Sequence, residues 1–162
     1  MSLDSDIQLL ATVRLFEGFR PEHLRLLAFG AEARMLARGT RLYRKNVPSD
    51  GGYVIVRGVV ELTSGGHDQD VQRYGEGALI GELALITDTM TPATAIAVEH
   101  TEVLKLPRTL FRRMLEEYPE LAQLLFDRLA HTTEELVGRL DIVRAKLDHA
   151  TDLQDRRERD RG

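Results

Sequence analysis

A short run in the middle of the chain joins a glycine, a carboxylate and the start of a helical turn. The run reads Gly81-Glu82-Leu83-Ala84. Gly81 has no Cβ, so a bound molecule can approach its backbone closely. A helical turn that begins at Glu82 would point the free N–H groups of Leu83 and Ala84 at an anion, because the first N–H groups of a helix have no partner inside it. These residues are therefore candidates for binding an anionic ligand.

The residue types that catalysis requires are not grouped in the chain. There is no cysteine, which excludes disulfides, thiol catalysis and cysteine-bound zinc or iron–sulfur clusters. The five histidines form neither an HxH nor an HExxH pair, and we interpret them as ordinary surface residues: His23, His67, His100, His131 and His149. We find no nucleophile–base constellation and no Walker-type glycine loop. We predict a protein that is not an enzyme and that holds no cofactor or metal.

The bulk composition is typical of one soluble domain. The chain has 162 residues, of which 43% are hydrophobic, enough to form a core at this length. Its formal net charge of -4 gives no overall basic field to attract nucleic acid or an anionic membrane. No apolar run approaches the ~20 residues of a membrane helix. We predict a cytoplasmic protein that contacts neither a membrane nor nucleic acid directly.

Two short helices are predicted at the N-terminus, within residues 4–30. The first covers residues 4–16, with Ser5 as its N-cap and apolar residues at roughly helical spacing. The second begins at Pro21, because proline is favoured in a first helical turn.

Residues 31–107 have the texture of short strands divided by glycines. Ser64-Gly65-Gly66-His67 is a natural hairpin turn, and Asn46 is a candidate left-handed position. Several short strands at close spacing favour an antiparallel roll or small barrel. The clearest predicted strands are 53–57, 59–63, 71–74, 94–98 and 102–106.

Helical periodicity returns over residues 108–149. Pro119 separates a short helix from a long one that covers about 120–149. Heptad positions along the long helix are mostly large and apolar, which predicts a homodimer through Phe126, Leu129, Leu136, Leu140, Val143 and Leu147. The alternative is an amphipathic helix that lies on its own roll. We expect the charged tail, residues 150–162, to be disordered.

The order of these elements, together with two motifs, resembles the cyclic-nucleotide-binding domain family. Residues 79–95, LIGELALITDTMTPATA, are similar to the phosphate-binding cassette of that family, which reads Gly-Glu-Leu-Ala-Leu, a short gap, then Arg-x-Ala-Thr. Residues 42–62, LYRKNVPSDGGYVIVRGVVEL, resemble its strand–turn–strand passage, with Tyr53, Ile55 and Gly58 at matching places. The likeness runs from about Phe16 to Leu147.

The resemblance implies a mainly β fold, an antiparallel β-roll (double-stranded β-helix, jelly-roll-like) with short helices before it and a long helix after it. It implies one domain over residues 1–147. It also implies cyclic AMP or cyclic GMP as ligand, with Glu82 accepting a hydrogen bond from the ribose 2′-hydroxyl. The cassette residues that correspond are Gly81, Glu82, Leu83, Ala84, Thr91, Pro92 and Thr94.

At its centre, the cassette of this chain departs from the family pattern. Thr91 stands where the family has the arginine that pairs with the cyclic phosphate, and Pro92, which follows, has no N–H to donate. No arginine or lysine occurs from residue 74 through residue 104. Removing one partner of a buried ion pair costs roughly 3–5 kcal/mol, on the order of a 100- to 3000-fold loss of affinity. We therefore predict weak or altered nucleotide binding, with Arg57 and Arg73 left as surface residues.

Two functions remain open at this point. The chain is either a regulatory sensor of a weakly bound cyclic nucleotide or unidentified anion, or a docking and dimerisation module that no longer binds a ligand. Only the charged tail follows Leu147, so unless the chain is truncated we expect no DNA-binding domain.

Overall fold

The computed structural model of the protein describes residues 2–65 and 71–128. It divides into two compact units, Met1–Leu121 and Ala122–Gly162. The first unit consists of two antiparallel sheets with helices before and after them, so the prediction of a mainly β roll with flanking helices is confirmed.

The N-terminal helices differ in detail from the prediction. Helix α1 covers Leu3–Ala11, and a separate 3-10 turn, η1, covers Arg14–Phe16, so the single helix predicted over residues 4–16 is wrong at its C-terminal end. Ser5 is not the N-cap. Ser2 caps α1, because its hydroxyl accepts a hydrogen bond from the N–H of Ser5, the third helical residue. The hydroxyl of Ser5 in turn accepts one from the N–H of Ser2. Helix α2, Pro21–Gly30, begins at the predicted proline.

Ten strands lie between residues 32 and 107 of the described chain. The five predicted strands are confirmed to within a residue or two, whereas the five others were not predicted. The strands are β1 (Glu32–Leu36), β2 (Arg41–Tyr43), β3 (Pro48–Ser49), β4 (Gly51–Arg57), β5 (Val60–Thr63), β6 (Val71–Tyr74), β7 (Leu79–Ile80), β8 (Thr89–Met90), β9 (Thr94–Ala97) and β10 (Thr101–Pro107).

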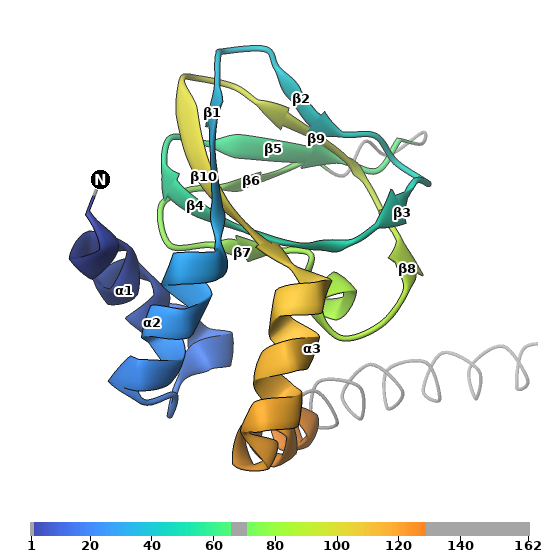
Figure 1. The fold of residues 1–162 in the computed structure, drawn as a ribbon. Coiled ribbons are helices and arrows are strands. Elements are labelled where there is room, and N and C mark those ends of the chain that lie inside the picture. The colour runs from blue at the N-terminus through green and yellow to red at the C-terminus, as the bar shows by residue number, and fades with distance from the viewer. Residues whose placement is uncertain (1, 66–70, 129–162) are drawn as a thin grey trace, which may run out of the picture. The chain divides into compact units, whose positions relative to one another are not determined.

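The strands form two four-stranded antiparallel sheets, in the orders β1-β10-β4-β7 and β2-β9-β5-β6, and a short ribbon of β3 and β8 (Figure 1). Side chains from both sheets meet in one apolar interior, to which Ile55 and Val103 contribute from the first sheet and Val60 and Ala95 from the second. β4 is buried on both faces, because helices cover the face turned away from this interior. Its run of apolar residues is typical of such a strand.

Helix α3 (Arg108–Glu117) follows β10 directly and packs against α2. Figure 1 shows α2 and α3 below β4 and β10, with α1 beside α2 at the left. Aromatic rings join the end of the roll that carries α3 to η1 and α2: the centroids of Phe16 and Phe111 are 5.8 Å apart, and those of His23 and Tyr118 are 4.5 Å apart. His23 is therefore a core residue rather than a surface one, because its imidazole fills space between these helices.

Residues 119–128 are also helical, and they begin at the predicted break at Pro119. In the second unit, Phe126 is 64% exposed. The rest of the predicted dimer helix (Leu129, Leu136, Leu140, Val143 and Leu147) and the charged tail lie outside the described residues.

Gly58 makes the tight connection between β4 and β5. Its φ of 94° is in the left-handed region that side chains disfavour. A Cβ at this position would lie 2.7 Å from the carbonyl oxygen of His100 and would also collide with Thr101. Gly39 has a similar φ of 85°, but no atom lies within 4 Å of the place a Cβ would take.

This pair separates backbone strain from steric collision. Both glycines have a left-handed φ, so alanine at either position should cost about 1–2 kcal/mol of unfolding free energy from backbone strain. For Gly39→Ala we expect this loss alone. Gly58→Ala should cost a further 1–3 kcal/mol, roughly, from overpacking against β10. Urea unfolding of the two variants measures the difference, and equal losses would contradict the proposed collision.

Candidate functional site

A cavity of about 440 Å³ opens between the interior of the roll and the segment 81–92. Gly81, Glu82, Leu83, Ala84, Thr91 and Pro92 all line it, so the structure brings six of the seven predicted cassette residues together around one space. Thr94 is not among the lining residues. Its hydroxyl instead accepts a hydrogen bond of 3.0 Å from the N–H of Lys45.

The turn after Gly81 is a 3-10 helix, η2 (Glu82–Leu85), and Gly81 has the left-handed φ of 82° that lets the chain turn sharply into it. The N–H of Ala84 donates to the carbonyl of Gly81 at 3.1 Å. The prediction of a free Ala84 N–H is therefore wrong. In a 3-10 turn an N–H bonds to the carbonyl three residues before it, rather than four as in an α-helix, so the third residue of the turn already has a partner. The N–H of Leu83 makes no hydrogen bond to any described residue.

Glu82 is exposed at the mouth of the cavity. Although the residue as a whole is exposed, partial desolvation of its carboxyl raises the pKa of this group above the ordinary value. Within the described part of the chain, no residue forms an ion pair or hydrogen bond with this carboxylate, so both of its oxygens are available to a ligand.

Thr91 is buried, and its polar groups are all engaged with the loop between β2 and β3. The hydroxyl donates to the carbonyl of Arg44 and accepts from the N–H of Val47 at 3.1 Å. The backbone of Thr91 also pairs with that of Val47 and of Asn46, which has the predicted left-handed φ of 61°. Thr91 therefore holds a neighbouring loop, and its hydroxyl has no proton left for a phosphate.

Among the described residues that line this cavity there is no arginine or lysine. Arg57 pairs with Glu102 at 2.7 Å and Arg73 with Glu61 at 3.0 Å. Both arginine side chains are more than half exposed, and neither lines the cavity. Neither arginine supplies this cavity with a cation.

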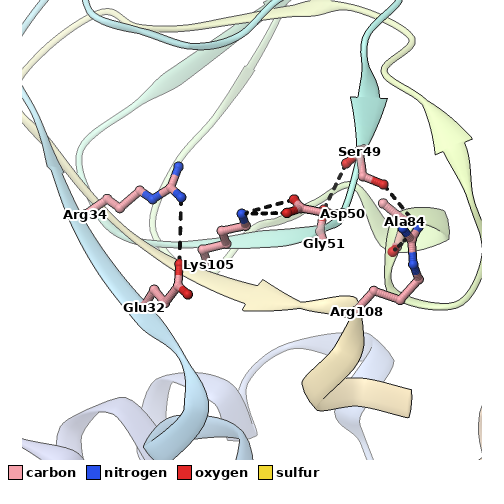
Figure 2. Close-up of polar contacts among 8 residues, drawn as sticks. All are labelled: Glu32, Arg34, Ser49, Asp50, Gly51, Ala84, Lys105 and Arg108. Carbon is pink, nitrogen blue, oxygen red and sulfur yellow. Dashed lines mark hydrogen bonds and ion pairs between the residues drawn. The ribbon is translucent and has the colours of Figure 1, made fainter. Parts of the chain in front are cut away.

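Arg108, the first residue of α3, is a site residue that the sequence did not reveal. Its guanidinium donates to the carbonyls of Ser49 at 3.0 Å, Thr87 at 2.7 Å and Ala84 at 3.4 Å, and pairs with Asp88 at 2.9 Å. Figure 2 shows it between β3 and η2. A cation is unfavourable at a helix N-terminus. An arginine directly after Pro107 therefore indicated that its side chain pairs with residues of the chain outside this helix.

A second ion pair involves β10, the strand that directly precedes α3. The ammonium of Lys105 on this strand contacts both carboxylate oxygens of Asp50, at 3.0 and 3.1 Å (Figure 2). The hydrogen bond from Lys105 lowers the pKa of the Asp50 carboxyl. This lysine is engaged with Asp50 and is not among the residues that line the cavity.

Three tyrosines also line the cavity, Tyr43, Tyr53 and Tyr74. The rings of Tyr43 and Tyr53 are 5.9 Å apart. Burial, with smaller contributions from Tyr53 and Tyr74, raises the pKa of Tyr43 to about 12. Strand alternation could have placed Tyr53 in the interior, but the position of Tyr43 depends on β2, which the sequence did not predict.

Among the described residues, no group of three histidine, aspartate or glutamate side chains is placed to hold a metal ion. Within the same ranges, no helix has both the length and the apolar character needed to cross a membrane.

A family model described as the cyclic nucleotide-binding domain matches residues 33–118. A cyclic nucleotide-binding-like protein from Brucella abortus is 45% identical, with a TM-score of 0.63 over 70% of this chain and 99% of that one. The regulatory domain of Toxoplasma gondii PKA, solved with cAMP, has a TM-score of 0.66 at 24% identity over 82% of this chain and 50% of its own, a likeness of fold alone.

Curated relatives include lysophospholipase nte1 of Aspergillus fumigatus, 31% identical over 136 residues. The neuropathy target esterase sws of Drosophila persimilis is 34% identical over 99 residues. The matches cover 82% and 59% of this chain but only 9% and 7% of those proteins. The chain thus spans less than a tenth of the length of these relatives.

Thr91→Val tests whether the threonine hydroxyl holds the loop. The isosteric change leaves the carbonyl of Arg44 and the N–H of Val47 without a partner, which should cost about 1–3 kcal/mol in urea unfolding. The matched control is Thr89→Val, because the Thr89 hydroxyl reaches only the adjacent Met90 carbonyl, at 3.4 Å. If the two variants were equally stable, Thr91 would not have this structural role.

Arg108→Ala should lower the unfolding free energy by about 2–4 kcal/mol, because several acceptors lose a charged donor that is only 14% exposed. Arg73→Ala is the control, since an exposed pair contributes about 1 kcal/mol or less. Thermal and urea unfolding give both values. A loss at Arg108 no larger than that at Arg73 would be evidence against a link between α3 and η2.

Proposed function

The chain belongs to the cyclic nucleotide-binding domain family, and we propose on that basis that it is a regulatory sensor whose pocket binds cyclic AMP or cyclic GMP weakly. Relative to a pocket that supplies an arginine, the loss of affinity is on the order of 100- to 3000-fold. The fold is regulatory and non-catalytic, and we assign to this chain none of the activity in the names of its long relatives.

One observation carries the proposal: the hydroxyl of Thr91 is bonded to Arg44 and Val47, and none of the described residues that line the cavity is an arginine or a lysine. A phosphate that entered in the family's usual pose would lose its water without gaining a cation. Burying an unpaired charge in this way is costly. Pro92 and the internal hydrogen bond of Ala84 remove two further donors.

The contacts of Arg108 provide a route for a signal in this proposal. A ligand that moves η2 changes the positions of the carbonyls of Ala84 and Thr87, and the same guanidinium is fixed to the first turn of α3. Helix α3 would then shift together with the segment 81–92. Such a response requires the ligand to bind one arrangement of η2 and α3 more tightly than the other.

The second candidate is a docking or dimerisation module without a ligand. The exposed ring of Phe126, at the first position of the predicted heptad seam, favours it. Analytical ultracentrifugation measures the oligomeric state that this candidate requires. A monomer at tens of micromolar protein would rule out the homodimer. The cytoplasmic location and the lack of direct contact with nucleic acid stay predictions.

Calorimetric titration with cyclic AMP and cyclic GMP tests the sensor proposal. We expect the wild-type protein to bind with Kd of about 0.1 mM or weaker, and Thr91→Arg to bind at least ~10-fold more tightly because it restores the cation. Thr91→Val is the control, since it releases the loop without adding charge. Micromolar affinity in the wild-type protein, or an equal gain in Thr91→Val, would falsify the argument from charge.

A further inference from the structure

Among the described residues that line it, the cavity has aromatic walls and one charged side chain, that of Glu82, which is negative. Tyr43, Tyr53 and Tyr74 contribute their rings, and Glu82 lies at the mouth. The hydroxyl of Tyr74 is held by Gln72 at 2.6 Å. The face of an aromatic ring carries a partial negative charge. The rings and the carboxylate of Glu82 therefore both favour a positively charged ligand.

The rim of the cavity is apolar and exposed. Leu83 is 58% exposed and Met90 is 52% exposed, and both are lining residues. A ligand with an apolar body would cover these side chains and exclude water from the rings below them. A strongly hydrated anion would gain nothing from such a rim.

We propose that this pocket takes a small organic cation, a quaternary or protonated alkyl or aryl amine, held by the rings of Tyr43 and Tyr74 and by the carboxylate of Glu82. The inference rests on the proposed role of the roll cavity as the ligand site. A cation gains from the ring faces and from the unpaired carboxylate together, whereas an uncharged molecule gains only from apolar contact.

One of the three rings, that of Tyr53, already lies beside a cation of the protein. The guanidinium of Arg34 lies 5.9 Å from the centre of the Tyr53 ring. Arg34 is paired with Glu32 at 3.7 Å and does not line the cavity, so its charge is partly compensated. The rings of Tyr43 and Tyr74 make no such contact with a cation among the described residues.

Chemical-shift titration of the full-length protein at constant ionic strength tests the inference, with tetramethylammonium as the cation and tert-butanol as its uncharged counterpart of similar size. We expect tetramethylammonium to bind in the millimolar range, at least ~5-fold more tightly than tert-butanol, with shifts at residues 82–91. Glu82→Gln should weaken the cation ~5-fold and leave tert-butanol unchanged. The control is Glu116→Gln, on the exposed face of α3.

The ring contribution has its own pair of variants. Tyr43→Leu should weaken tetramethylammonium ~5-fold, and Tyr43→Phe, which keeps the ring and the fold, should bind within ~2-fold of wild type. Equal binding of the two probes, or an unchanged affinity in Glu82→Gln, overturns the cation inference. It leaves the sensor proposal standing, because that proposal is tested by the affinity for cyclic nucleotides of the wild-type protein and of the Thr91 variants.

Discussion

The hydroxyl of Thr91 is buried, and a buried hydroxyl must find its hydrogen-bond partners inside the protein. It finds them in the loop between β2 and β3, where it bridges the carbonyl of Arg44 and the N–H of Val47. This bridge joins one wall of the cavity to a loop 44–47 residues earlier in the chain. In the proposed function, the same position is the one from which a ligand's phosphate would be bound. The same contact that stabilises the roll thus determines the chemistry of its pocket.

A second constraint acts at the other end of the cassette. Arg108 begins α3 and donates to carbonyls of β3, of η2 and of Thr87, which follows η2, so the pocket wall and the helix that leaves the roll share one guanidinium. The Thr91 contacts hold the far end of segment 81–92 to the roll, and Arg108 holds its near end to a helix. A segment held at these two points is suited to report occupancy, provided a ligand favours one arrangement of the segment and α3 over another.

Much of the fold was predictable because glycines and alternating apolar residues mark the longer strands, and Pro21 and Pro119 mark helix starts. The two-residue strands β3, β7 and β8 carry no periodicity, since two residues cannot show alternation. The cassette could be located from GELAL and the place of Thr91, but not the partners of the Thr91 hydroxyl. They come from a loop far away in sequence, as do the partners of Arg108, and no local pattern encodes them.

The central claim is that Thr91 serves the loop and not a ligand. A crystal structure of the protein grown with several millimolar cyclic AMP tests this most directly. We predict that the Thr91 hydroxyl remains bonded to the carbonyl of Arg44 and that no phosphate lies against it. An ordered cyclic phosphate accepting a hydrogen bond from Thr91, with the Arg44 contact broken, would contradict the account.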